Sequence, residues 1–167
     1  MGCGKSSLGR RIARRAGVAF IDTDSVIEEQ EGAGVVDIFR YEGEEYFRRA
    51  ERALIERIIA DEGDAVVSTG GGLPVWGDNM ELMNAAGATV YIRRSAEQIA
   101  SRLTPYGRRK RPRLRGLSDE ELVAFMRENI AEREPFYSKA RYVFDTEHIG
   151  DDELANAVIG ILNGDER

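Results

Sequence analysis

The chain has 167 residues, of which 42% are hydrophobic and 32% charged, and its formal net charge is -6. This length predicts one domain with a core that needs no covalent staples. One cysteine and one histidine exclude an internal disulfide framework and the usual structural zinc sites. The acidic balance disfavours binding to nucleic acid, and no apolar run approaches the roughly 20 residues of a membrane span. The start, MGCGKSSLGRR, lacks the apolar segment of a signal peptide, so we expect a cytoplasmic protein without membrane contact.

Helical and extended patterns alternate along the chain. Apolar residues recur every fourth position from Lys5 to Ala16, which predicts a helix ended by Gly17, and the apolar run 18–21 predicts a strand ending at Asp22. The later elements that we expect are helical turns around Val26 and Ile38, a helix over 44–61, strands over 65–67, 89–92 and 142–144, and helices over 78–86, from Ser95, from Ser118 to Pro135, and over 151–162. The Ser95/Gln98 and Ser118/Glu121 pairs predict capping boxes. Strands separated by helices predict an α/β fold with a parallel sheet covered on both faces.

The first residues contain part of a phosphate-binding motif. Gly2-Cys3-Gly4-Lys5-Ser6 is the second half of G-x-x-x-x-G-K-[ST], and it runs directly into the predicted helix. Glycines let backbone N–H groups converge on phosphate, lysine neutralises it, and the hydroxyl binds Mg²⁺. The first glycine of the motif would fall two residues before Met1. The alternative is a glycine-rich start followed by an ordinary helix N-terminus.

Two further candidates follow predicted strands. Asp22 and Asp24 lie at the carboxyl end of the first strand, where open α/β sheets bind ligands. One carboxylate would face a metal and the other a substrate hydroxyl, although Asp24 could instead cap the next helix. Gly70, Gly71 and Gly72 close the next strand, and they allow a backbone to approach a ligand closely or simply to turn.

A basic run lies between two predicted helices. Six cations fall within residues 108–115, and without them the formal charge would change from -6 to -12. A nucleic-acid arm, a solvated loop and a mobile lid that closes an arginine over phosphate all remain open. Arg133, near the end of its helix, could complement the helix dipole or clamp a carboxylate.

The order of these motifs resembles shikimate kinase, a compact family in the P-loop nucleoside-monophosphate-kinase-like group. The matching segments, in order, are GCGKSS, FIDTD, EEYFRRAE, STGGG, KRPRL and EREPFYSKA. The resemblance implies one domain over 1–167, a substrate-binding helical region over 24–62 and a lid over 103–117. It also implies a five-stranded parallel sheet of order 2-3-1-4-5, whose central first strand is missing from this chain.

On the nucleotide side, the resemblance implies ATP as co-substrate with Mg²⁺. Lys5 would contact the ATP phosphates, Ser6 would bind the metal directly, and Asp22 would reach it through water. Arg111 would be the lid arginine on the γ-phosphate. The residues around ATP would be Gly2, Cys3, Gly4, Lys5, Ser6, Ser7 and Arg111, and Cys3 is given no catalytic role.

On the substrate side, the resemblance implies phosphorylation of the 3-hydroxyl of shikimate, in the chorismate and aromatic amino acid pathway, by a monomer. Asp24 would bind the attacking hydroxyl as base or orienting group, and Arg48 and Arg133 would hold the shikimate carboxylate. The backbone of Gly70–Gly72 would line the pocket. Alternatives are a sibling small-molecule kinase such as a gluconate kinase, and a non-catalytic shikimate- or nucleotide-binding module.

Two segments depart from the family pattern. Without the central strand, neighbouring strands would leave buried backbone groups unpaired, at about 1–3 kcal/mol each. We therefore expect either a start about ten residues upstream, as the family's layout implies, or a damaged copy. The segment Asp145-Thr146-Glu147-His148-Ile149 lacks the family's Arg or Pro near the adenine, and we expect His148 to be a surface residue.

Overall fold

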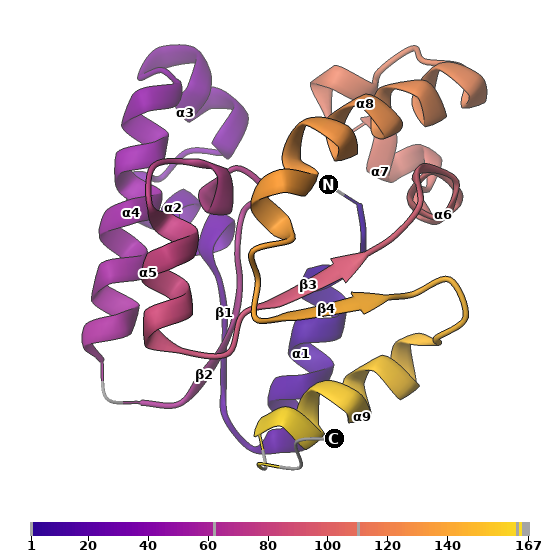
Figure 1. The fold of residues 1–167 in the computed structure, drawn as a ribbon. Coiled ribbons are helices and arrows are strands. Elements are labelled where there is room, and N and C mark those ends of the chain that lie inside the picture. The colour runs from indigo at the N-terminus through magenta and orange to yellow at the C-terminus, as the bar shows by residue number, and fades with distance from the viewer. Residues whose placement is uncertain (1, 62, 110, 163, 165–167) are drawn as a thin grey trace.

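The computed structural model describes residues 2–61, 63–109, 111–162 and 164, and it alternates helices and strands (Figure 1). The strands are β1 (Ala19–Asp22), β2 (Ala65–Ser68), β3 (Val90–Arg93) and β4 (Tyr142–Asp145). The helices are α1 (Lys5–Ala16), α2 (Thr23–Glu31), α3 (Val35–Tyr41), α4 (Glu44–Ala60), α5 (Asn79–Ala86), α6 (Ala96–Arg102), α7 (Pro105–Arg109), α8 (Asp119–Tyr137) and α9 (Asp151–Leu162), with 3₁₀ turns η1 (Leu73–Val75) and η2 (Pro112–Leu114). The predicted α/β class is confirmed. Met1 and Lys110, which belong to the sequence predictions above, lie outside the described residues.

The strands form two parallel pairs. β1 pairs with β2, from Ala19 opposite Ala65 to Asp22 opposite Ser68. β3 pairs with β4, from Val90 opposite Tyr142 to Arg93 opposite Asp145. Within the described residues the two pairs remain separate sheets, so the five-stranded order is not observed.

Three clusters of buried apolar side chains replace a single core. One joins α1 and α9 beneath the strands, a second joins α2, α3 and α4, and a third joins α6 and α8 with the 103–117 segment. Phe47 and Leu54 of the predicted α4 stripe are buried in the second cluster. No helix of the described part of the chain is both long and apolar enough to cross a membrane.

The helix boundaries follow the local sequence with two exceptions. Gly17 adopts φ 72° after α1, and both predicted capping boxes are present, at Ser95 and Ser118. Asp24 does not cap α2, because Asp22 is the N-cap residue and accepts a hydrogen bond from the Ser25 backbone. The prediction that Pro135 stops the long helix is wrong: α8 continues to Tyr137. A proline removes one hydrogen bond there, and the helix closes one turn later through the Ser138 N–H and the Glu134 carbonyl.

The predicted lid segment contains regular structure. Within 103–117, α7 and η2 are short helical turns, and Leu103 and Leu114 are buried. Arg108 pairs with Asp119 at the start of α8, at 2.6 Å. The basic run is therefore anchored to the third cluster through leucines, while most of its arginines remain on the surface.

Candidate active site

The phosphate-loop fragment, residues 2–6, ends at the first turn of α1. Gly2 and Gly4 have φ of 76° and 85°, a left-handed conformation that favours glycine. The Gly4 carbonyl accepts the first bond of the helix, from the Leu8 N–H, at 3.0 Å. The fragment therefore has the conformation in which a helix N-terminus can receive an anion, as its sequence predicts. Cys3 is half-buried against the third cluster, and Ser7 is exposed.

Three oxygen-bearing side chains meet behind this fragment. The Ser6 hydroxyl donates to the Asp22 carboxylate at 2.6 Å and lies 3.3 Å from the Ser68 hydroxyl. Asp22 and Ser68 end the paired strands β1 and β2, so the pairing brings both to the start of α1. Magnesium prefers oxygen ligands, commonly one or two carboxylates completed by water and phosphate. The donor set of Ser6 and Asp22 fits that ion.

Asp24 is the second residue of α2, and it lies beside the triple glycine Gly70–Gly72. The Gly70 N–H donates to the Thr23 hydroxyl at 2.9 Å, which joins the start of α2 to the end of β2. Burial raises the pKa of Asp24, while the nearby charge of Lys5 lowers it and that of Asp22 raises it further. A carboxylate with a raised pKa that faces a lysine is suited to accept a proton.

Each glycine of the triple glycine faces a different polar side chain. A Cβ on Gly70 would collide with Glu51 and with Asp24, and one on Gly72 would collide with the Arg48 guanidinium. A Cβ on Gly71 would lie 3.1 Å from Nη1 of Arg133. The absence of side chains on this segment is therefore what allows helices α2, α4 and α8 to bring their polar groups together.

Arg48 is held by two carboxylates of its own helix. It donates to Glu51 at 2.5 Å and to Glu44 at 2.9 Å. Glu51 is fully buried, burial raises its pKa against the opposing effect of Arg48, and its Oε1 has no partner among the described atoms. Glu51 was not among the site residues predicted from the sequence. It lies four residues after Phe47 and three before Leu54, so a charged residue within the apolar stripe was the available signal.

Arg133 and Arg48 line one cavity of about 140 Å³. Gly72, Val75, Trp76 and Glu44 complete its wall. Arg133 has no hydrogen-bond or ion-pair partner among the described residues. Tyr137, one turn further along α8, donates to the Gly71 carbonyl at 2.6 Å and fixes this helix against the triple glycine. The structure thus brings together the two predicted carboxylate-binding arginines.

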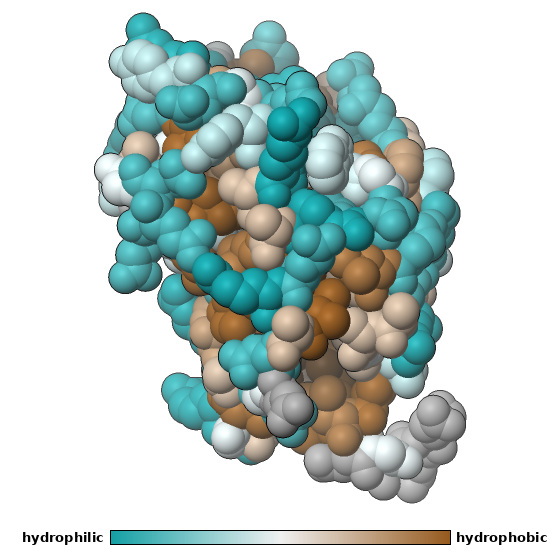
Figure 2. Space-filling view, turned by 90° about the vertical axis from the view of Figure 1, so that its left-hand side faces the viewer, coloured by the Kyte–Doolittle hydropathy of each residue, from teal (hydrophilic) through white to brown (hydrophobic). Residues whose placement is uncertain are grey.

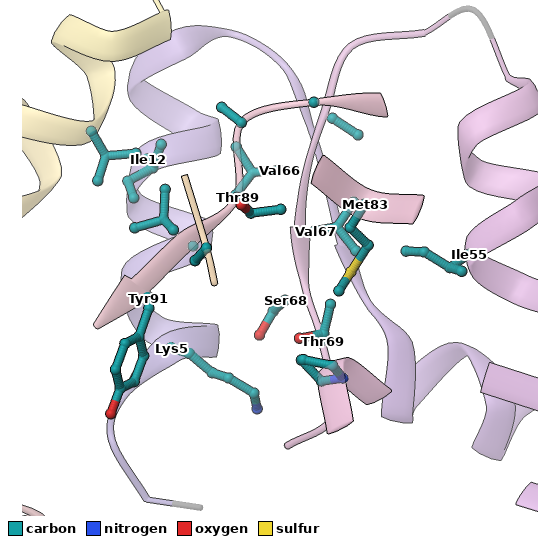
Figure 3. Close-up of a pocket in the computed structure, with 18 of the residues that line it drawn as sticks. Lys5, Ile12, Ile55, Val66, Val67, Ser68, Thr69, Met83, Thr89 and Tyr91 are labelled. Carbon is teal, nitrogen blue, oxygen red and sulfur yellow. The ribbon is translucent and has the colours of Figure 1, made fainter. Parts of the chain in front are cut away.

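Arg111 is the predicted site residue that the structure does not bring to the others. Its guanidinium donates to the Gly107 carbonyl at 2.6 Å, inside the lid segment. Lys5 extends from the start of α1 toward Ser68 and Thr69 at the end of β2 (Figure 3). His148 is exposed, as predicted.

Comparison with known proteins gives a consistent result over nearly the whole chain. The sequence model of a family described as shikimate kinase matches residues 1–163. The shikimate kinase of Parabacteroides distasonis is 43% identical over 97% of this chain and 95% of its own. That of Phocaeicola vulgatus is 40% identical, over 97% and 91%.

Solved structures agree with the sequence relatives. The crystal structure of shikimate kinase from Bacteroides thetaiotaomicron superposes with a TM-score of 0.83 at 35% identity, covering 98% of this chain and 94% of that one. Shikimate kinase from Acinetobacter baumannii in complex with shikimate gives a TM-score of 0.83 at 28% identity, with 99% and 90% covered. The phosphate-loop fragment, the carboxylate pair and the arginine-lined cavity thus occur in a chain that belongs to the shikimate kinase family.

Proposed function

We propose that this protein transfers the γ-phosphoryl group of ATP to the 3-hydroxyl of shikimate, giving shikimate 3-phosphate and ADP. The observation that carries the proposal is the convergence of Asp24, Arg48 and Arg133 on three consecutive glycines. A small carboxylic acid with several hydroxyls needs cations at one end and a hydrogen-bond acceptor at the other. The convergence supplies both.

The cavity between Arg48 and Arg133 is the proposed seat of the shikimate carboxylate. Guanidinium groups match a carboxylate in planar, bidentate geometry. Glu51 and Glu44 already neutralise part of the positive charge of Arg48, whereas Arg133 has no such partner among the described residues. Arg133 therefore contributes the uncompensated positive charge.

The phosphate-loop fragment is the proposed binding site of the ATP phosphates. Lys5 and the N-terminus of α1 would neutralise them, and Ser6 with Asp22 would hold Mg²⁺. When bound, the ion would supply charge neutralisation at the phosphates. Residues 103–117 are the proposed lid, and Arg111 would exchange the Gly107 carbonyl for the γ-phosphate when the lid closes.

Asp24 is the proposed acceptor of the hydroxyl proton. The shikimate oxygen forms a bond to the γ-phosphorus, the bond to the bridging oxygen of ADP breaks, and the hydroxyl proton passes to the Asp24 carboxylate. The raised pKa makes that carboxylate a better base than an exposed aspartate. Holding the reactants in line and excluding water provides most of the remaining acceleration.

A coupled assay of ADP release tests this reaction. We expect ADP release that depends on shikimate and on Mg²⁺, with no turnover of gluconate. Turnover of gluconate alone would contradict the proposal and identify a sibling kinase. Calorimetric binding of shikimate without ADP release would contradict it in favour of a binding module.

A further inference from the structure

The last turns of α8 carry Arg133 into the cavity that it shares with Arg48, and they contain a proline. Pro135 has no N–H, so the Ala131 carbonyl lacks its usual helical donor. Arg133 itself has no hydrogen-bond or ion-pair partner among the described residues. The position of its guanidinium therefore depends on what holds the backbone at this end of the helix.

Glu134, the residue after Arg133, is held by three other side chains. Its Oε2 accepts a hydrogen bond from the Tyr91 hydroxyl at 2.5 Å. Its Oε1 accepts from Nε of Arg93 at 2.9 Å and from the Ser138 hydroxyl at 3.1 Å. Tyr91 and Arg93 are two residues apart on β3, so their side chains leave the same face of the strand, beside which the C-terminal end of α8 lies (Figure 1). We call these four residues the Glu134 network.

The Glu134 carboxylate is less exposed than that of a typical surface ion pair. Hydrophilic side chains cover most of the upper part of the face in Figure 2. An exposed pair such as Arg49–Glu45, whose side chains are 72% and 74% exposed, does little to fix a geometry. The Glu134 side chain is 31% exposed. Burial raises its pKa, but the hydrogen bonds from its three partners outweigh burial and place the pKa below its ordinary value, so these bonds are charge-assisted at neutral pH.

A second attachment holds the neighbouring side of the same helix end. The Tyr137 hydroxyl donates to the Gly71 carbonyl at 2.6 Å, and the rings of Tyr137 and Tyr91 lie 5.2 Å apart. Arg133 and Tyr137 are four residues apart and share one side of the helix, and Glu134 lies about 100° further round. One attachment alone would leave the helix end free to rotate, whereas the two together fix its height and its rotation.

We propose that Glu134, held by Tyr91 and Arg93 of β3, is a positioning residue for Arg133. The Glu134 network fixes the rotation of the end of α8 and so keeps the Arg133 guanidinium beside Gly71, where a Cβ would lie 3.1 Å from its Nη1. Glu134 acts on the substrate only through Arg133. That this guanidinium holds the carboxylate of shikimate rests on the proposed function, whereas the positioning itself does not.

Two conservative substitutions disrupt the Glu134 network. Glu134→Gln removes the charge, and Tyr91→Phe removes one hydroxyl and keeps the ring against Tyr137. We expect each to raise the KM for shikimate by about 3- to 10-fold with kcat within about twofold, as for the loss of one hydrogen bond. Removing a negative charge next to Arg133 would by itself favour an anionic substrate, so a rise in KM for Glu134→Gln has the sign of lost positioning and not of changed charge.

Glu132→Gln and Tyr142→Phe are matched controls for these substitutions. Glu132 is exposed and precedes Arg133, and Tyr142 is half-buried at the start of β4; neither belongs to the Glu134 network. Both controls should leave the KM for shikimate near that of the parent. A rise equal to that of the network variants would overturn the proposal, since the loss of any nearby charge or hydroxyl would then be sufficient.

A double-mutant cycle separates positioning from a general loss of structure. In the Arg133→Ala background, Glu134→Gln should change the KM for shikimate by less than about twofold, because no guanidinium is left to position. An undiminished effect in that background would overturn the proposal, because Glu134 would then act by a route that does not pass through Arg133.

Nuclear magnetic resonance of the protein without substrate tests the positioning separately from the reaction. The Nε–H signal of Arg133 is identified by its loss in Arg133→Ala, and its heteronuclear NOE reports fast motion of the guanidinium. We expect a lower NOE in Glu134→Gln and Tyr91→Phe and the parent value in the two controls, and an unchanged NOE in the network variants would overturn the proposal. A parent protein that fails to turn over shikimate would instead contradict the proposed function, and the NOE comparison would still decide whether Glu134 positions Arg133.

Discussion

Arg48 and Arg133 face the same cavity with different partners. Glu51 and Glu44 bind Arg48, while Arg133 has no partner among the described residues. We expect Arg133→Ala to raise the KM for shikimate by about 10- to 100-fold, the equivalent of one lost charge-assisted hydrogen bond, with a much smaller change in kcat. Steady-state kinetics with shikimate varied at saturating ATP measures the two constants.

Arg14→Ala is a matched control for that substitution. Arg14 is exposed on α1 and belongs to no part of the proposed site. Arg14→Ala removes the same charge from the molecule as Arg133→Ala but leaves the proposed site intact. We therefore expect the KM for shikimate to stay near that of the parent. Equal effects of the two substitutions on the KM for shikimate would mean that Arg133 acts only through the overall electrostatic field of the protein.

Asp24 has a different expected signature. Asp24→Asn keeps the shape of the side chain and removes the proton acceptor, so we expect kcat to fall by about 10²- to 10⁴-fold. The KM for shikimate should change little, because an amide oxygen still accepts a hydrogen bond from a hydroxyl. A variant with unchanged kcat would reduce Asp24 to an orienting group.

The raised pKa of Asp24 also has a consequence for stability. A carboxyl whose pKa is higher in the folded protein stabilises it fully at pH below the ordinary value of 3.8 and loses that contribution as pH rises through the folded value. We therefore expect Asp24→Asn and the parent to have similar Tm at low pH, with the variant increasingly more stable as pH rises. Thermal unfolding at a series of pH values gives this difference directly, and a constant difference would argue against the burial of a charge.

At the level of elements, the role of the start of α1 can be tested by comparing substitutions of the glycines at its two ends. Gly4 and Gly17 lie at opposite ends of this helix, with φ of 85° and 72°. Alanine at either position costs about 1–2 kcal/mol of backbone strain. A Cβ on Gly4 would also lie 3.2 Å from the Arg102 guanidinium, whereas nothing lies within 4 Å of one on Gly17.

We expect Gly4→Ala and Gly17→Ala to lower Tm by similar amounts, but only Gly4→Ala to raise the KM for ATP. Thermal unfolding and kinetics with ATP varied compare the two properties. A similar rise in the KM for ATP in both variants would mean that loss of helix stability, rather than the phosphate-loop fragment, affects nucleotide binding.

Some elements could be predicted from local sequence and others could not. The capping boxes at Ser95 and Ser118 depend on residues three apart, and both are present. The prediction that α8 ends at Pro135 was wrong, because contacts of the last turn offset the cost of the one lost hydrogen bond. These contacts include the hydrogen bond from the Tyr137 hydroxyl to the Gly71 carbonyl. Glu51 could not be predicted as a site residue, because its burial depends on Gly70, nineteen residues later. The periodicity of a single helix carries no information about such a distant contact.

For the molecule as a whole, the alternation of helical and extended patterns predicted the α/β class. The family resemblance implied the grouping of Asp24, Arg48 and Arg133, which the structure brings together. The position of Arg111 could not be predicted, because a lid has more than one arrangement and the sequence does not select between them. The three separate clusters of buried side chains could not be predicted either, because apolar periodicity identifies the buried face of a helix but not the element that covers it.

The triple glycine brings three helices into contact with one short stretch of backbone. Asp24 and Arg48 reach it from α2 and α4, which pack together in the second cluster, and Arg133 reaches it from α8, which packs in the third. Energies of residues that share a contact do not add. In a double-mutant cycle, Arg48→Ala and Arg133→Ala should therefore give a coupling energy well above that of distant pairs. The specificity for the bound acid then depends on the three helices together rather than on any one of them.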